Sequence, residues 1–502
     1  MKKIVSVIAA AAVALSLCAC NKTNVSVSDI GSDGVPANPG ESGGAVSAGE
    51  SMNVGGDIVD DPRNLPPDDK QLTLLCCGDS FWGAGCGTDT GYYSIQSNIA
   101  GGGFNGTPYD CITYIDYATK QEVILCSDSS CKHDSERCTG IVPGGWRLSD
   151  ELFFYKEHLY CLIADLDNEG AFSYSYSAEG YSDSYSAGGY YNDEYAIVPK
   201  LYRMDPDGTN RVLVYTFGEK EKVEHFAVGD GDCIWFITKE PTIERDEKTG
   251  ATHSGSKNRA LVRLDLNERD IVEQIPISYG DNIKKDFIGV CGSKIIFGGI
   301  AYPDGKSAMD YIDIIAPSPI VGDMSGWDEY KAFMSTCEYA FFTLDVTDKT
   351  IREIYRTGFD DVSLDYSQVG ERLYIPTGED YTSAFKLDLN TGGTGEYFVP
   401  EGYALDGFVG EHPLYITASG EYERCLYDPD TGEMKHWIFD TGTTNIIAMN
   451  SDSALVWYKT VGEEKPDGGF RNPYYLYAMI TLDDLYNGRE NFEPIDMLKR
   501  NV

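Results

Sequence analysis

The sequence has few basic side chains and few histidines, and it lacks several short motifs that mark enzymes. Lysine and arginine total 40 against 80 aspartates and glutamates, so the formal net charge is −40 at pH 7. A surface of this charge repels nucleic acids and anionic lipid headgroups, so we expect neither as a ligand. No H-E-x-x-H, P-loop, C-x-x-C or sialidase-type Asp-box is present, and the six histidines are scattered. No catalytic residue is therefore assigned from the sequence.

Long helical periodicity is also missing. Short β-branched and aromatic runs alternate with Asp, Gly and Pro turns, which predicts an all-β fold. One unit recurs, consisting of an apolar strand, an aspartate-led turn and a second strand. Its aspartates are Asp116, Asp205, Asp265, Asp345, Asp388 and Asp428, and a degenerate copy begins at Tyr475.

The spacing of these units favours a β-propeller. Most units follow another aromatic strand, and the closest aspartates recur at roughly 40 residues, the length of a four-stranded blade. We therefore predict one propeller over residues 71–502, with seven blades, although six or eight remain compatible with the irregular first and last units. Insertions are expected at residues 166–195 and 301–338. Ring closure is expected to pair strands from the two ends of the chain.

Two stretches carry a resemblance to a known family. They are the Y-R-M-D-P-D-G-T-N hairpin at Tyr202–Asn210 and the cysteine-rich stretch after the first hairpin. With the repeated hairpin, they make most of the chain similar to TolB-like and related β-propeller lipoproteins of anaerobic Gram-positive bacteria. The resemblance implies the propeller fold but no activity, because propellers host unrelated functions.

The first seventy residues predict export and a lipid anchor. A basic start precedes the apolar stretch Ile4–Leu17, which is too short for a lasting membrane span. Leu17-Cys18-Ala19-Cys20 resembles a lipobox, which implies that residues 1–19 are a lipoprotein signal peptide and that Cys20 becomes diacylated. Residues 20–70 are rich in Gly, Ser, Pro and Asp and are expected to be a disordered tether. We expect an extracytoplasmic lipoprotein held at the membrane.

Three cysteines and a histidine lie close together after the first hairpin. In an extended segment Cys131 and His133 face the same side, and Cys126 and Cys138 flank them at spacings that zinc loops tolerate. Three thiolates and an imidazole would form a closed, structural zinc site. A disulfide among the three cysteines, or unliganded thiols, explains the same residues equally well.

The sequence leaves two functions in competition. The 166–195 insertion has the Tyr, Ser and Gly composition of binding surfaces, although a disordered acidic loop would look the same. Its candidate contact residues are Tyr174, Tyr176, Tyr181, Tyr185, Tyr190 and Tyr191. The first hypothesis is a binding or scaffold module for an unidentified protein or envelope ligand. The alternative is a surface carbohydrate-active hydrolase or lyase with carboxylates at the mouth of the propeller channel.

Overall fold

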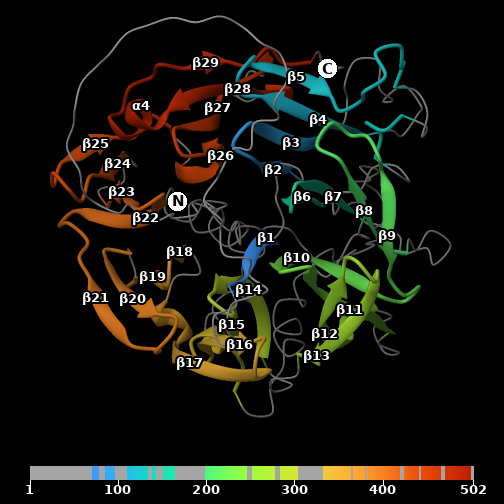
Figure 1. The fold of residues 1–502 in the computed structure, drawn as a ribbon. Helices are drawn as coiled ribbons and strands as arrows, with labels where there is room; N and C mark the ends of the chain where they lie inside the picture. The colour runs from blue at the N-terminus through green and yellow to red at the C-terminus, as the bar shows by residue number, and fades with distance from the viewer. Residues whose placement is uncertain are drawn as a thin grey trace, which may run out of the picture.

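Seven antiparallel sheets, arranged as the blades of a ring, make up the described part of the chain (Figure 1). The structure is a computed structural model, and it describes residues 71–77, 85–96, 110–133, 138–142, 151–163, 198–245, 252–277, 283–303, 332–362, 366–378, 381–418, 423–439, 442–464 and 470–498. The prediction of a nearly all-β, seven-bladed propeller is confirmed. The predicted signal peptide, the tether and the 166–195 insertion lie outside these residues, and so do Cys20 and the six candidate tyrosines.

Each blade is a contiguous run of four strands, numbered here from the channel outwards. Blade 1 contains β2 (Gly85–Gly87), β3 (Gly91–Gln96), β4 (Cys111–Asp116) and β5 (Gln121–Ile124). Blade 2 contains β6 (Glu151–Tyr155), β7 (His158–Ile163), β8 (Lys200–Met204) and β9 (Val212–Thr216). Blade 3 contains β10 (Lys222–Asp230), β11 (Cys233–Arg245), β12 (Thr252–Asp265) and β13 (Asp270–Pro276). Blade 4 contains β14 (Ile283–Cys291), β15 (Lys294–Ala301), β16 (Glu338–Asp345) and β17 (Thr350–Gly358).

The remaining three blades follow in the same order. Blade 5 contains β18 (Ser367–Val369), β19 (Arg372–Thr377), β20 (Ser383–Asp388) and β21 (Thr394–Tyr397). Blade 6 contains β22 (Tyr403–Val409), β23 (His412–Thr417), β24 (Arg424–Tyr427) and β25 (Met434–His436). Blade 7 contains β26 (Ile446–Met449), β27 (Ser453–Glu464), β28 (Phe470–Thr481) and β29 (Glu493–Pro494), with the short helix α4 (Leu482–Tyr486) between β28 and β29.

The repeated aspartates start the turns between the two outer strands of a blade. In five of these turns the residue four positions after the aspartate has a positive φ, and its amide donates to the aspartate carbonyl at 2.8–2.9 Å. The Asp265 carboxylate also accepts hydrogen bonds from the amides of Asn267 and Glu268 at 2.8 and 2.9 Å. Such hydrogen bonds favour aspartate in the turn and lower the pKa of Asp265 below its usual value. The five pairs are Asp116 with Lys120, Asp265 with Arg269, Asp345 with Lys349, Asp388 with Gly392, and Asp428 with Gly432.

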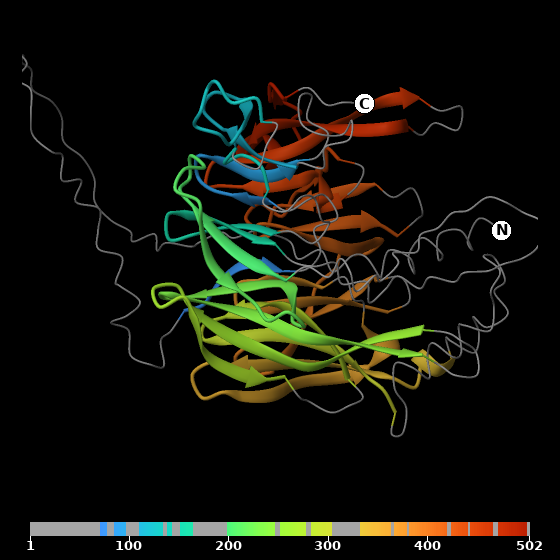
Figure 2. The same cartoon turned by 90° about the vertical axis from the view of Figure 1, so that its right-hand side faces the viewer.

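The two faces of the ring differ because of this strand order. The aspartate turns and the tight turns between the two inner strands lie on one face, which we call the turn face. The second and fourth strands of each blade end toward the opposite face, which we call the loop face. The β11–β12 and β27–β28 hairpins project on the loop face, on the right-hand side of Figure 2. In the sequence, both predicted insertions fall between the second and third strands of a blade, β7–β8 and β15–β16, and their residues 166–195 and 304–331 lie outside the described ranges.

Buried apolar clusters join every pair of neighbouring blades, and one of them closes the ring. That cluster combines Tyr92 and Ile115 of blade 1 with Leu455 and Tyr477 of blade 7. Gly87 is needed at this interface, since an added Cβ would lie 2.9 Å from the Cβ of Ala448.

The expected closure by strands from both ends of the chain is wrong in one respect. The first strand, β1 (Thr73–Cys77), does not join blade 7 or blade 1 but pairs antiparallel with β10, on the channel side of blade 3 (Figure 1). Residues 493–498, which we call the closing strap, connect blade 7 to blade 1 instead. The Ile495 amide donates to the Tyr477 carbonyl at 2.9 Å, while Asp496 exchanges backbone hydrogen bonds of 2.8 and 3.0 Å with Lys120 and Glu122.

Candidate functional site

The cysteine loop, residues 126–138, follows the outer strand β5 of blade 1, and the chain after it returns to pair with β4. The amide of Leu125 donates to the Ile112 carbonyl at 2.9 Å, and the Ile112 amide donates to the Gly140 carbonyl at 2.8 Å. Ile112 in β4 therefore holds both stems of the loop. The stems approach so closely that a Cβ on Gly140 would lie 2.7 Å from the Ile124 Cγ2 atom.

Blade 2 packs against the same stems. Arg211 donates through Nη1 to the carbonyl of Ile141 at 2.6 Å and to that of Thr139 at 3.3 Å. Gly208, in the aspartate turn between β8 and β9, has a φ of 79°, and an added Cβ would lie 2.6 Å from the Leu125 carbonyl oxygen. The base of the cysteine loop is thus held between two blades.

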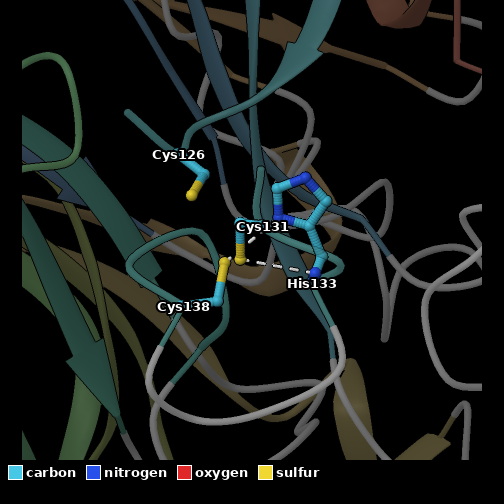
Figure 3. Close-up of side chains that lie close together, drawn as sticks. All are labelled: Cys126, Cys131, His133 and Cys138. Atoms are coloured by element: carbon cyan, nitrogen blue, oxygen red, sulfur yellow. Dashed lines mark hydrogen bonds between the residues drawn. The ribbon is translucent and has the colours of Figure 1, made fainter. Parts of the chain in front are cut away.

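The structure brings together the four residues predicted as metal ligands or disulfide partners (Figure 3). The ligand atoms of Cys126, Cys131, His133 and Cys138 all lie within 4.8 Å of one another. The His133 Nδ1 atom is 3.2 Å from the Cys138 sulphur, and the His133 amide donates to the Cys131 sulphur at 3.4 Å. Three sulphurs and one imidazole nitrogen form the ligand set of structural zinc sites. The cluster could therefore hold a metal ion.

His133 joins the cluster through a turn and not through the extended segment that the sequence analysis assumed. Its φ is 53°, in the left-handed region. The preceding turn is organised by Asp128, whose carboxylate accepts from the Ser130 amide at 2.8 Å and whose carbonyl accepts from the Cys131 amide at 3.0 Å. The one-residue spacer between Cys131 and His133 is compatible with a shared site because of this left-handed residue.

The thiols of the cluster differ in acidity. Burial raises the pKa of Cys126, but hydrogen bonds with the Asp128 backbone and with the other two thiols outweigh it, and the pKa lies below the usual value of a thiol. Burial raises the pKa of Cys138 to about 12. Cys126 is therefore the first of these two thiols to lose its proton. Cys126, Cys131 and Cys138 are not bridged by a disulfide in this structure.

Two exposed aromatic residues lie on the loop face of blade 5. Phe398, directly after β21, is 77% exposed, and Tyr381, between β19 and β20, is 44% exposed. Their carbonyls accept hydrogen bonds from blade 6, from the Tyr415 hydroxyl at 3.2 Å and the Leu405 amide at 3.4 Å. No sequence prediction singled out this pair, since exposure depends on which face of the ring a loop occupies.

Two carboxylates of low exposure, Glu151 and Glu224, lie toward the loop-face ends of inner strands. Glu151, the first residue of β6, contacts the His225 imidazole at 2.8 Å. Glu224 pairs with Arg259 and with Lys239, the latter at 3.5 Å. Burial raises the pKa of Glu224, but these two cations together hold it below its usual value. Glu224 is thus engaged in ion pairs and Glu151 in a contact with an imidazole, and such contacts stabilise a fold as readily as they prepare a catalytic site.

A small cavity of about 200 Å³ lies on the turn face between blades 6 and 7. His412, Asp428 and Tyr486 are among its lining residues, and the His412 ring stacks on Tyr486 with centroids 4.2 Å apart. Small-molecule pockets usually measure about 300–1,000 Å³. The cavity is too small to indicate a substrate site.

Comparisons with known proteins add no family. No family model and no curated protein sequence matches the chain. A structure from a study of two prolyl endopeptidases aligns with 84% of this chain and 47% of its own, at 11% identity and a TM-score of 0.36. The acylaminoacyl peptidase of Pyrococcus horikoshii aligns with 64% of this chain and 43% of its own, at 12% identity and a TM-score of 0.34. This chain spans less than half the length of either peptidase chain.

A TolB structure has a more similar length. TolB from Acinetobacter baumannii aligns with 85% of this chain and 81% of its own, at 10% identity and a TM-score of 0.28. Likenesses this weak carry no function to the chain, and the seven sheets establish the propeller without them. Among the described residues, no helix is long and apolar enough to cross a membrane.

Proposed function

We propose that the chain is a lipid-anchored, extracytoplasmic β-propeller that binds a protein or an envelope ligand through its loop face. The asymmetry of the two faces carries the proposal. The turn face carries tight hydrogen-bonded turns, whereas Phe398 and Tyr381 are exposed at the loop face, where the strands β7 and β15 that precede the two long insertions end. Aromatic side chains supply much of the contact area in protein interfaces at a low cost in conformational entropy.

The path of the first strand is consistent with this orientation. β1 begins opposite Gly229, near the turn face, and the Leu72 amide donates to the carbonyl of Gly292 in the β14–β15 turn at 2.9 Å. A tether that ends at residue 70 would therefore reach the propeller at its turn face. A flexible tether of this length spans roughly 40 Å on average. The loop face would then lie on the side opposite the point of attachment, accessible to a partner.

Photo-crosslinking tests the binding face. A photoreactive residue is placed at Phe398 or Tyr381 and, as a matched control, at Leu213, an exposed apolar residue of the outer strand β9. We expect the two loop-face positions to capture the same partner in intact cells and the Leu213 position to capture none of it. Equal capture at all three positions, or capture at Leu213 alone, would contradict a loop-face interface.

Anchoring is tested separately. Cys20→Ser should release the protein from membranes or leave an unprocessed precursor, because the acylated side chain is lost. Wild-type processing and membrane association in this variant would show that Cys20 is not the anchor.

The enzymatic alternative depends on the buried carboxylates. Hydrolysis of a glycan would require Glu151 or Glu224 to reach the substrate, but Glu151 contacts His225 and Glu224 pairs with Arg259 and Lys239. Screening the protein and a Glu151→Gln variant against envelope glycans tests it: turnover that the variant loses would favour the enzyme over the binding module.

A further inference from the structure

The cysteine loop and the closing strap meet in one apolar cluster. Cys111, Cys138 and Ile141 form its buried part, and the partly buried residues packed against them include Cys126, Cys131 and Leu498. Leu498 belongs to the closing strap and arrives from blade 7. The three cysteines among the candidate metal ligands and the residue that ends the described strap thus belong to one apolar cluster, at the junction where the ring closes.

Hydrogen bonds fix the strap beside this cluster. The Leu498 amide donates to the Oε2 atom of Glu122 at 3.0 Å, and Glu122 is only 3% exposed. The Glu122 amide in turn donates to the Asp496 carbonyl at 3.0 Å. Lys120, directly before β5, pairs with Glu493 at 3.2 Å. The strap therefore contacts blade 1 from the aspartate turn to the base of the cysteine loop.

The ligand set fits zinc better than calcium or magnesium. A tetrahedral zinc site with three sulphurs and one nitrogen has ligand-to-ligand separations of about 3.5–3.8 Å. The cluster, with all separations within 4.8 Å and the His133–Cys138 pair at 3.2 Å, reaches this geometry by small side-chain movements. The cluster itself contains no carboxylate or carbonyl ligand of the kind that calcium and magnesium prefer, and soft thiolates select zinc.

Part of the loop is already held in the ligating arrangement by its own backbone. The left-handed His133 directs its amide at the Cys131 sulphur, and Ile112 fixes both stems. Such contacts around the ligands orient them and support metal affinity.

From this geometry we propose that Cys126, Cys131, His133 and Cys138 bind one structural zinc ion. The zinc fixes the conformation of the cysteine loop, against which Leu498 and the closing strap pack. Each of the three thiols releases its proton to solvent as it binds, so zinc, three thiolates and a neutral imidazole carry one net negative charge. All four coordination positions are filled by the protein, which leaves no position for a substrate. The role is to close the ring, independently of what the loop face binds.

Metal content of the full-length protein, purified without oxygen, tests the site. We expect about one zinc per chain in the wild type and in the control Cys425→Ser, which removes a partly buried cysteine of blade 6. Cys131→Ser and His133→Ala should lose most of it. His133→Cys should retain it, since four thiolates also bind zinc. Absence of zinc from the wild type, or a mass two daltons low that maps to a disulfide in this loop, would overturn the proposal.

Hydrogen exchange tests the closure. Removing zinc from the wild type with a chelator should speed exchange of the Asp496 and Leu498 amides by about tenfold or more, because local opening sets their exchange rates. Amides of β19 and β20, across the ring in blade 5, should not change. His133→Cys loaded with zinc should protect the strap as the wild type does. Unchanged exchange at Asp496 and Leu498 after complete zinc removal would overturn the closing role.

Discussion

Replacing Asp110 by asparagine should stabilise the protein at neutral and alkaline pH but not in acid. Asp110 lies directly before β4 and is 3% exposed, and its Oδ2 atom has no hydrogen-bond partner among the described residues. Burial without compensation raises its pKa to about 7. Ionising the Asp110 carboxyl therefore costs free energy in the folded protein, whereas it has no such cost in the unfolded chain.

The magnitude follows from the shift. The unfolded carboxyl titrates at about 3.9, so the folded pKa is about three units higher, and each unit is worth about 1.4 kcal/mol. Below pH 4 both states bind the proton, and Asp110 has no pH-dependent effect. Between about pH 4 and pH 7 the unfolded state has lost the proton while the folded state keeps it, so stability falls as the pH rises. Above pH 7 the full destabilisation, on the order of 2–4 kcal/mol, is reached.

Asparagine cannot ionise, and it resembles the protonated carboxyl in size and polarity. The difference in the free energy of unfolding between Asp110→Asn and the wild type should therefore grow from near zero at pH 4 to about 2–4 kcal/mol at pH 8. Urea denaturation at four or five pH values measures it. Asp89→Asn, at an exposed position in the β2–β3 turn, is the matched control and should show no such trend. A difference that stays constant from pH 4 to pH 8 would refute the reasoning.

Three further predictions concern packing, charge and closure. Gly208→Ala should destabilise by about 1–3 kcal/mol more than Gly231→Ala, since both have positive φ but only the first adds a methyl 2.6 Å from a carbonyl oxygen; equal midpoints in urea would contradict the clash. Glu224→Gln should cost about 3–5 kcal/mol because it leaves buried cations without their carboxylate, whereas Glu353→Gln, in a more exposed pair, should cost under about 1 kcal/mol; similar losses in thermal scans would argue against burial as the cause. Deleting residues 495–502 should expose the blade 7–blade 1 junction and lower the melting temperature; an unchanged melting temperature would show that apolar packing alone closes the ring.

The sequence predicted the elements whose causes are local. An aspartate that accepts two backbone amides, followed by a left-handed residue, is a short-range signal, and it located hairpins such as those at Asp265 and Asp388. Repetition of that signal about every blade length then predicted the propeller. The approach of Cys126, Cys131, His133 and Cys138 was predicted from spacing, again a local property.

Which segments far apart in the sequence contact each other could not be predicted in this way. β1 is an apolar strand that could pair with the edge of any blade. Nothing within Thr73–Cys77 specifies β10 as its partner. The contact of Leu498 with the cysteine loop joins residues more than 300 positions apart, and it depends on how the last blade packs on the first. The left-handed backbone of His133 was also missed, because histidine tolerates but does not require that conformation.

β1 pairs with blade 3, whereas the closing strap connects blade 7 to blade 1. The first strand of the propeller and the closure of the ring are therefore at different places in the structure. A pull transmitted through a membrane tether would load the antiparallel pairing of β1 with β10 in blade 3. The ring closes elsewhere, through the strap, the apolar cluster around Tyr477 and the base of the cysteine loop. Because blade 3 keeps β10 to β13 as a complete four-stranded sheet without β1, detaching the first strand leaves no blade short of a strand. If the chain is anchored as proposed, tension on it would load β1 before the ring, so that the proposed binding face could stay intact.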